Sequence, residues 1–359
     1  MFSSFRVYLA VALALLVFAT PWIALNHPDQ VQVFTEIFRK AAVEVAAVIL
    51  HNPRTITELQ TKYATSSFVM NSSTQLALSQ LVNLAQSTST SWSASTTATP
   101  SKIRILIVPG HEPDLGGAEY GSLKERKMNV ELAQDLAGLL KADPHFQVFM
   151  TRDNDAWDPV FASYFKDNWN AIKAWQKDSH KEMKHLVAVG STTAPTSKVF
   201  HNAAPVNPAF RLYGITKWSN ENLVDVVIHI HFNDFADHVD GVPGKYSGFA
   251  IYVPVAQYAN STTTKAVANA VFERLKQHDQ VSNLPGESSG IVDEPSLIAI
   301  GSNNTADAAS MLIEYGYIYE TRFNTATRRE VIFKRMASDT YLGLQDFFMG
   351  DNRVAPRSF

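Results

Sequence analysis

The distribution of apolar residues along 102–151 predicts a strand, a helix and a second strand. The largely apolar run 103–108 ends at Pro109-Gly110, which is typical of a strand buried on both faces of a parallel sheet. A helix is predicted to begin near Glu125, because apolar residues then recur at helical spacing. These residues are Met128, Leu132, Leu136 and Leu139. The run 146–151 predicts the second strand, so the unit is βαβ.

Short apolar runs and helical periodicities continue to residue 348. Strands are predicted at 224–230, 247–253, 297–300 and 311–313, and helices at 211–222, 264–278 and 326–348. A further helical face lies within 157–208, a stretch that ends in a predicted loop at 194–208. This face contains Phe161, Tyr164, Phe165, Trp169, Ile172, Trp175, Met183 and Leu186. The alternation predicts an α/β fold, a mainly parallel or mixed twisted sheet with helices on both faces.

The N-terminal residues predict a transmembrane anchor at 7–25, an uncharged apolar segment close to the length of about 20 residues that spans a bilayer. Arg6 precedes it and Asp29 follows it. The positive-inside rule therefore places residues 1–6 in the cytoplasm and the rest of the chain outside. A cleaved signal peptide is the alternative. The absence of a small-x-small site at the end of the run, and the presence of Trp22, favour an uncleaved anchor.

The region between the anchor and the α/β domain carries no recognisable chemistry. Residues 26–85 include two helical patterns and are interpreted as a stalk. Residues 86–101 are rich in serine and threonine, which is typical of a linker. The domain is therefore predicted to span 102–350, with a C-terminal tail at 351–359.

Composition excludes several classes of function. Hydrophobic residues form 46% of the 359-residue chain, which is enough for a large core. The net charge of −3 is small, so neither nucleic acid nor a polyanionic partner is indicated. The chain contains no cysteine, which excludes a disulfide framework, a cysteine zinc site and a cysteine nucleophile.

Candidate chemistry lies where the predicted strands end. His111 follows the first strand, and Glu125 stands in the first turn of the next helix. Open α/β sheets place their sites at the carboxyl ends of strands, and a helix N-terminus favours a carboxylate. A histidine and a glutamate brought together in this way could share a metal ion.

Four short motifs follow one another along the domain. Pro-Gly-His at 109–111 is followed by a glycine-rich loop and by Glu-Arg-Lys-Met-Asn-Val at 125–130. The later motifs are Val-Val-Ile-His-Ile-His-Phe-Asn at 226–233 and Met-Leu-Ile-Glu-Tyr-Gly at 311–316. In this order, over roughly residues 102–349, they resemble the zinc-dependent N-acetylmuramoyl-L-alanine amidases of the family-3 type.

This resemblance implies roles for four residues. His111, Glu125 and His231 would bind Zn²⁺, a set that leaves one position open for water. Glu314 would be the catalytic carboxylate, which takes a proton from the water and passes it to the leaving amine. The family cleaves the amide between N-acetylmuramic acid and L-alanine of the stem peptide. The resemblance thus implies a membrane-anchored amidase that acts on peptidoglycan outside the cytoplasmic membrane.

Several neighbouring residues leave alternatives open. His229 lies on the same strand face as His231 and could replace it as a ligand. The family pattern His-x-Asn favours His231, which leaves His229 in the core or in support of a ligand. Glu112 stands where the family usually has glycine and is expected to point to the surface. A solvated helix face is expected for His180, Glu182 and His185.

The stretch 157–208 lies in a connection that is longer than in related amidases. Some division-associated members of the family carry a helix here that covers the zinc until a partner protein removes it. Glu182 would then be the group that reaches the metal, and an activator protein would act on this insertion. A scaffold or a wall of the substrate groove is the favoured alternative. Two other functions remain open, a non-catalytic wall-binding or regulatory protein and a zinc peptidase.

Overall fold

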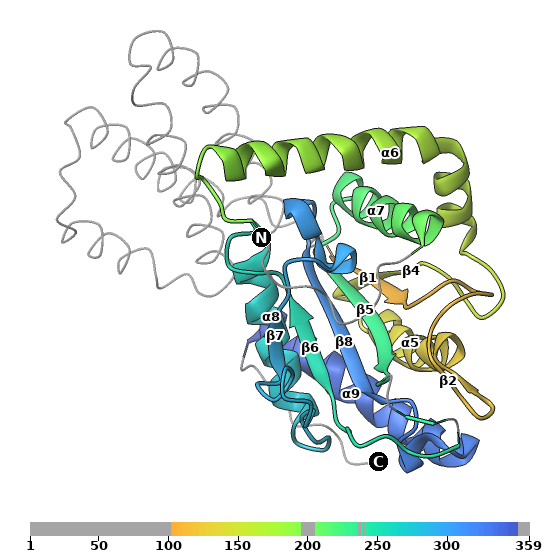
Figure 1. Ribbon diagram of the computed structural model, residues 1–359. Helices are drawn as coiled ribbons and strands as arrows, with labels where there is room; N and C mark the ends of the chain where they lie inside the picture. The colour runs from red at the N-terminus through yellow and green to blue at the C-terminus, as the bar shows by residue number, and fades with distance from the viewer. Residues whose placement is uncertain (1–101, 195–204, 236–237, 240, 351–359) are drawn as a thin grey trace, which may run out of the picture. The chain divides into compact units, whose positions relative to one another are not determined.

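The computed structural model describes residues 102–194, 205–235, 238–239 and 241–350. Its centre is a six-stranded sheet in the order β4-β1-β5-β8-β6-β7 (Figure 1). The strands are β1 (Ile103–Pro109), β4 (Phe146–Met150), β5 (Val226–Asn233), β6 (Ala250–Val253), β7 (Ile291–Asp293) and β8 (Ala309–Tyr317). Strands β4, β1, β5 and β8 are parallel to one another, whereas β6 runs antiparallel to β8. The predicted α/β fold with a mainly parallel, mixed sheet is confirmed.

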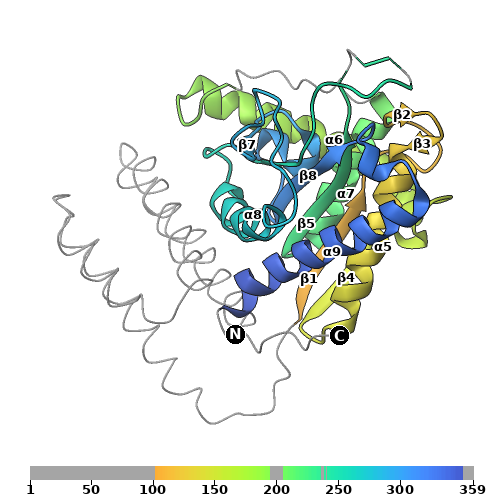
Figure 2. The same ribbon diagram turned by 90° about the horizontal axis from the view of Figure 1, so that it is seen from below.

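Helices cover both faces of this sheet (Figures 1 and 2). On one face α6 (Pro159–Ala188) and α7 (Val206–Glu221) pack against a cluster that includes Leu106, Val108 and Val227. On the other face lie α5 (Glu125–Ala142), α8 (Ser261–Leu275) and α9 (Ala326–Met349), and α9 contacts both α5 and α8. The central strands read as continuous apolar runs because both of their faces are covered.

The connection between β4 and β5 contains two helices, α6 within the predicted insertion 157–208 and α7, which extends beyond it to Glu221; the two helices together are called the insertion below. In α6 the residues Phe161, Phe165, Ile172 and Met183 are buried, which confirms the helical face predicted for this stretch. Helix α7 starts at Val206 and therefore includes residues that were predicted to be loop. Gly214 marks the crossing of the two helices, because a Cβ there would lie 2.9 Å from the Ile172 side chain.

Two other predictions about local structure are wrong. Residues 297–300 were predicted as a strand, but Ile298–Ile300 form the 3-10 helix η3, and the strand of this region is β7. A four-residue apolar run does not distinguish a short buried strand from a short buried helix. Leu139 was predicted to be buried but is 36% exposed, and Leu140 takes its place in the buried stripe of α5.

The predicted N-terminal and C-terminal segments lie outside the described residues. This applies to the cytoplasmic residues 1–6, the anchor 7–25, the stalk 26–85, the linker 86–101 and the tail 351–359. Within the described ranges, no helix has the length and apolar character needed to cross a bilayer. The membrane anchor and its orientation therefore stay predictions.

Candidate metal centre

Three side chains meet at the carboxyl edge of the sheet. His111 follows β1, Glu125 is the first residue of α5, and His231 lies near the end of β5. One donor atom from each of them lies within 4.8 Å of the others. His111 Nε2 is 2.8 Å from Glu125 Oε2, and His231 Nδ1 is 3.0 Å from Glu125 Oε1. The structure thus brings together the three residues that were predicted to bind the metal.

Sheet register and two glycines make this convergence possible. β1 and β5 are parallel neighbours, with Pro109 opposite Ile230, so the histidines that follow lie at the same edge with ring centroids 4.9 Å apart. A Cβ on Gly110 would lie 2.2–2.6 Å from the His231 ring. A Cβ on Gly117 would lie 2.9 Å from the His111 ring and 3.1 Å from the Glu125 side chain. Any larger residue at either position would therefore displace a candidate ligand.

Glu125 is held in its charged form. Burial opposes its ionisation, but the charges of His111 and His231 and their hydrogen bonds outweigh burial, so the pKa of this carboxyl lies well below its usual value. The backbone N–H groups of Ala118 and Phe232 donate to its two oxygens at 2.8 and 3.2 Å. Its place at the start of α5 adds the favourable end of the helix dipole.

The geometry around His111 fits a divalent metal ion. His111 Nε2 is buried and lies 2.8 Å from Glu125 Oε2, and His231 Nδ1 lies 3.0 Å from Glu125 Oε1. Nitrogen and oxygen atoms that converge this closely are what a shared cation requires. Two imidazoles and one carboxylate form an established donor set for catalytic zinc.

Glu314 lies on β8 directly beside His231 of β5 in the sheet register. It stands within the strand and not at its end, because β8 continues to Tyr317. Burial, and then the charges of Glu125 and Glu287, hold the pKa of Glu314 well above its usual value. Its Oε2 atom is buried and has no hydrogen-bond partner. A carboxyl of this kind has the raised pKa that suits a general acid or base near neutral pH.

Glu287 is not among the residues predicted from the sequence; it is 1% exposed and belongs to the turn before β7. Its Oε1 accepts hydrogen bonds from Asn233 Nδ2 at 2.8 Å and Tyr252 at 2.6 Å. Its Oε2 accepts hydrogen bonds from the hydroxyls of Ser282 and Tyr317. Asn233 is the last residue of the His-x-Asn pattern that begins with His231. This pattern therefore connects the candidate ligand His231 to Glu287, the carboxylate whose charge acts on Glu314. The position of Glu287 after Pro285-Gly286 gives no signal of such a role.

Arg152 is likewise not among the predicted site residues; it follows β4 and is 1% exposed. Its guanidinium donates to the carbonyl groups of Pro109, Gly110 and His111. Burial lowers the pKa of Arg152 to about 10, although neighbouring carboxylates, Glu112 first, oppose this shift. His111 has a φ of 69°, which is unusual for a residue with a side chain. Arg152 supports the backbone that holds His111 in this conformation.

The structure places His229 and Glu112, the two residues near the centre whose roles were open. His229 is 2% exposed and lies outside the group of candidate ligands. Burial, with a smaller contribution from His231, lowers the pKa of His229 to about 3, so this imidazole is neutral in the core. The prediction for Glu112 is wrong, because it is 8% exposed and Arg211 of α7 pairs with it at 2.9 Å. A salt bridge from α7 therefore buries this carboxylate.

Glu182 is exposed, as expected for a solvated helix face, and it does not belong to the candidate ligand group, so the structure does not place it at the metal centre. The segment after α6 runs toward the other edge of the sheet, where Thr192 donates to Gln257 at 2.6 Å. Gln257 follows β6, which is antiparallel to β8 and so ends away from the metal centre. His185 is exposed, as expected, whereas His180 is half-buried and lies 3.0 Å from the Tyr213 hydroxyl.

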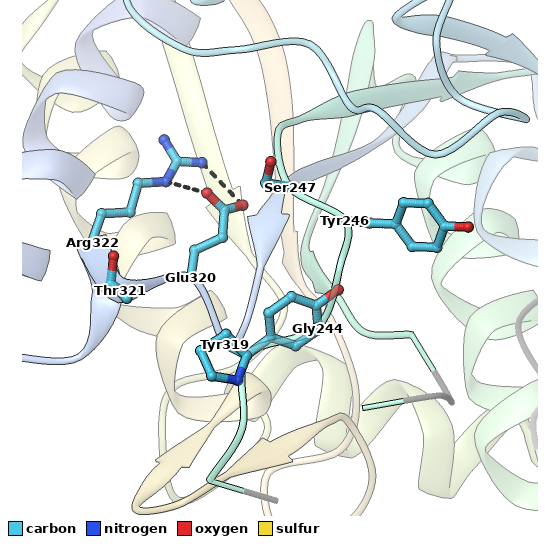
Figure 3. A pocket seen from close by; sticks show the side chains of 8 residues that line it. Gly244, Tyr246, Ser247, Tyr319, Glu320, Thr321 and Arg322 are labelled. Carbon is cyan, nitrogen blue, oxygen red and sulfur yellow. Dashed lines mark hydrogen bonds and ion pairs between the residues drawn. The ribbon is translucent and has the colours of Figure 1, made fainter. Parts of the chain in front are cut away.

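A pocket of about 290 Å³ opens beside the segments that precede β6 and follow β8 (Figure 3). It is lined by Pro243, Gly244, Tyr246, Ser247, Tyr319, Glu320, Thr321 and Arg322. Arg322 pairs with Glu320 at 2.8 Å, so the charges in its wall are balanced. Tyr319 also contacts His238, which pairs with Asp234 three residues after His231. The pocket thus adjoins the edge that carries the metal centre.

The fold and the centre describe an α/β protein in which two imidazoles and the carboxylate of Glu125 meet at the sheet edge as a set that could hold a metal ion, with the buried carboxyl of Glu314 beside them. The profile of the N-acetylmuramoyl-L-alanine amidase family matches residues 105–346. The chain belongs to this family, and the predicted enzyme class, a peptidoglycan amidase, is confirmed.

Several solved amidase structures are similar to this chain. The CwlD amidase from Clostridioides difficile, solved in complex with the GerS lipoprotein, is 17% identical with a TM-score of 0.46 and covers 70% of this chain and 100% of that chain. The amidase Ami1 from Mycobacterium smegmatis is 12% identical with a TM-score of 0.47 and covers 71% and 100% of the two chains. The amidase AmiC2 from Nostoc punctiforme is 14% identical with a TM-score of 0.41 and covers 70% and 99%. No curated protein matches the chain.

Proposed function

We propose that this chain is a zinc-dependent amidase that hydrolyses the bond between N-acetylmuramic acid and L-alanine of the stem peptide. The observation that carries the proposal is the convergence of His111, Glu125 and His231 beside the buried carboxyl of Glu314. The three residues would hold Zn²⁺. When bound, zinc supplies a Lewis acid that activates water and polarises a carbonyl group.

The residues of the chain divide the remaining tasks. Glu314, whose carboxyl is buried beside His231, would take a proton from the attacking water and deliver it to the leaving amine. Glu287 would hold Asn233 and Tyr252 through the hydrogen bonds that it accepts from them, and its charge acts on Glu314. Arg152 would hold the carbonyl groups of residues 109–111, so that His111 keeps its orientation.

Two alternative functions differ from the proposed one, the first in its need for the metal site and the second in its reaction products. A non-catalytic wall-binding protein would need neither a complete donor set nor a protonatable glutamate beside it, yet the chain has both. A zinc peptidase would share the site but would cut between amino acids. Amidase cleavage leaves the lactyl group on the sugar and releases a peptide that begins with L-alanine.

The test uses the purified full-length chain, metal analysis and digestion of defined muropeptides. We expect about one zinc per chain and release of the intact stem peptide. Peptide fragments shorter than the stem would indicate a peptidase. Stoichiometric zinc without any cleavage, in the presence of wall extracts that could supply an activator, would favour the non-catalytic function.

The location of the reaction is also part of the proposal. The uncharged segment 7–25 and the preceding Arg6 support a single-pass anchor with the catalytic domain on the extracytoplasmic side. A reporter enzyme fused after Phe359 should then be active only outside the cytoplasm, and the full-length protein should fractionate with membranes and keep its N-terminus. Recovery of a soluble form that begins near Asn26 would indicate a cleaved signal peptide.

A further inference from the structure

Glu112 is a buried carboxylate that directly follows the candidate ligand His111. Its side chain is 11% exposed, and Arg211 Nη1 donates to Glu112 Oε2 at 2.9 Å. The two residues are 99 positions apart in the sequence, and Arg211 belongs to α7 of the insertion. The insertion therefore makes a direct polar contact with the loop that carries His111.

The backbone of this loop does not depend on Arg211. Arg152 already accounts for the carbonyl groups of Pro109, Gly110 and His111, and the Glu112 N–H donates to the Leu115 carbonyl at 3.1 Å. The contact that Arg211 adds is to the carboxylate of Glu112. The contact with Arg211 should therefore determine where the Glu112 carboxylate lies.

Arg211 is itself held in place by aromatic rings. Its guanidinium lies 5.9 Å from the ring centroid of Trp169 on α6, and that ring packs edge-on against Phe210 at 5.8 Å. Lys173 lies 5.6 and 5.4 Å from the same two rings. Contacts of this kind fix a planar guanidinium better than a flexible ammonium group. A continuous series of contacts thus leads from α6 through Arg211 to the residue after His111.

A carboxylate beside a catalytic metal is a potential extra ligand. A catalytic zinc site keeps one position open for water, and a further carboxylate in that position would remove it. We propose that Arg211 is a positioning residue, which keeps Glu112 paired and out of the coordination sphere of the metal bound by His111, Glu125 and His231. This inference rests on the proposed metal site. It gives the insertion a role in keeping that site open.

The test uses two substitutions that break the same ion pair. Arg211→Met removes the ion-pair partner of Glu112 and leaves only the charge of the nearby Arg152, whereas Glu112→Gln leaves no carboxylate that could bind the metal. A purely structural ion pair would make the two variants alike. The proposal makes them different, and the double variant Glu112→Gln/Arg211→Met should behave like Glu112→Gln.

The readout is the absorption spectrum of the full-length chain loaded with Co²⁺ in place of zinc, because this spectrum reports the coordination number. We expect Arg211→Met to retain Co²⁺, to show the weaker bands of a higher coordination number, and to lose roughly 100-fold in amidase rate, which lies within the range of second-sphere effects. Glu112→Gln and the double variant should keep the wild-type spectrum. Arg211→Lys should fall between wild type and Arg211→Met.

A matched control is Arg274→Met, which breaks an ion pair of 2.6 Å between α8 and α9, outside the site. It should lower the melting temperature without changing the Co²⁺ spectrum. Wild-type spectra in Arg211→Met, or equal spectral changes in Arg211→Met and Glu112→Gln, would overturn the inference. A wild-type chain that binds no Co²⁺ or Zn²⁺ would instead overturn the proposed function.

Discussion

Glu125 and Glu314 are two buried glutamates of one site, and their surroundings give them opposite properties. Burial opposes the ionisation of Glu125, but His111 and His231 outweigh it, so the pKa of Glu125 lies well below its usual value; two backbone N–H groups also donate to this carboxylate. Burial, and then the charges of Glu125 and Glu287, hold the pKa of Glu314 well above its usual value, and one of its oxygens has no hydrogen-bond partner. The same side chain thus suits a metal ligand in one place and an acid or base in the other.

The comparison also shows which parts of the fold produce the difference. Glu125 starts a helix and lies under the ends of β1 and β5, where backbone N–H groups are available. Glu314 lies inside β8, where the backbone N–H and C=O groups are used by the sheet and only side chains remain. Glu287 adds a fixed negative charge on that side. Substitutions on each side should therefore have distinct effects.

The largest effect is expected from substitution of the candidate metal ligands. His111→Ala or His231→Ala should lose stoichiometric zinc and all measurable amidase activity, because two of three donors cannot hold the metal in an open site. The far-UV circular dichroism should remain native, since the apolar strands of the sheet hold the fold.

His229→Ala is the control for this experiment, because His229 lies on the same strand face but outside the candidate ligand group. It should keep zinc and lose only stability. If His231→Ala kept stoichiometric zinc and His229→Ala lost it, the ligand assignment would be wrong.

The second effect concerns Glu314 alone. Glu314→Gln should lower turnover by roughly 10²–10⁴-fold, the usual contribution of a general acid or base. Zinc content, measured by atomic absorption, should stay near wild type because Glu314 is not assigned as a ligand. Loss of the metal together with activity would make Glu314 a fourth ligand and remove the contrast with Glu125.

The third effect concerns the charge of Glu287, which acts on Glu314. Glu287 raises the pKa of Glu314, so Glu287→Gln should lower that pKa and move the acidic limb of the pH–rate profile to lower pH. Ser282→Ala is the control, because it removes a hydrogen bond to Glu287 but leaves its charge. Equal shifts in the two variants would show that the hydrogen bonding of Glu287, and not its charge, determines the pH of the acidic limb.

The smallest effect is on the stability of the metal-free protein. Because the folded-state pKa of Glu314 lies above the unfolded value of 4.5, the native state binds more protons, and stability falls as the pH rises above that value. Glu314→Gln removes this loss, so the variant should melt a few degrees higher than wild type at pH 7, as about 1 kcal/mol shifts Tm by roughly 2–4 °C. The advantage should vanish near pH 4. A constant difference across this range in calorimetry would contradict the assigned shift.

The sequence by itself determined the α/β alternation, and its resemblance to the amidase family supplied the three candidate ligands. An apolar run followed by Pro-Gly indicates a strand end, and parallel strand ends meet at one edge of a sheet, so local pattern placed His111 at that edge, whereas the family pattern His-x-Asn selected His231. Local pattern was not enough for residues 297–300, where a run of four apolar residues fits either a strand or the 3-10 helix that forms.

Only the tertiary structure decided the surroundings of these residues. Glu112 was expected at the surface, but a residue 99 positions away on α7 pairs with it and buries it. Arg152 and Glu287 have no local pattern that marks them, because their partners come from other strands and turns. Local sequence periodicity sets which face of an element is apolar, whereas the partner of a buried charge depends on which distant elements pack beside it. Long-range packing therefore determines the opposite pKa shifts of Glu125 and Glu314, and the sequence alone could supply only the residues themselves.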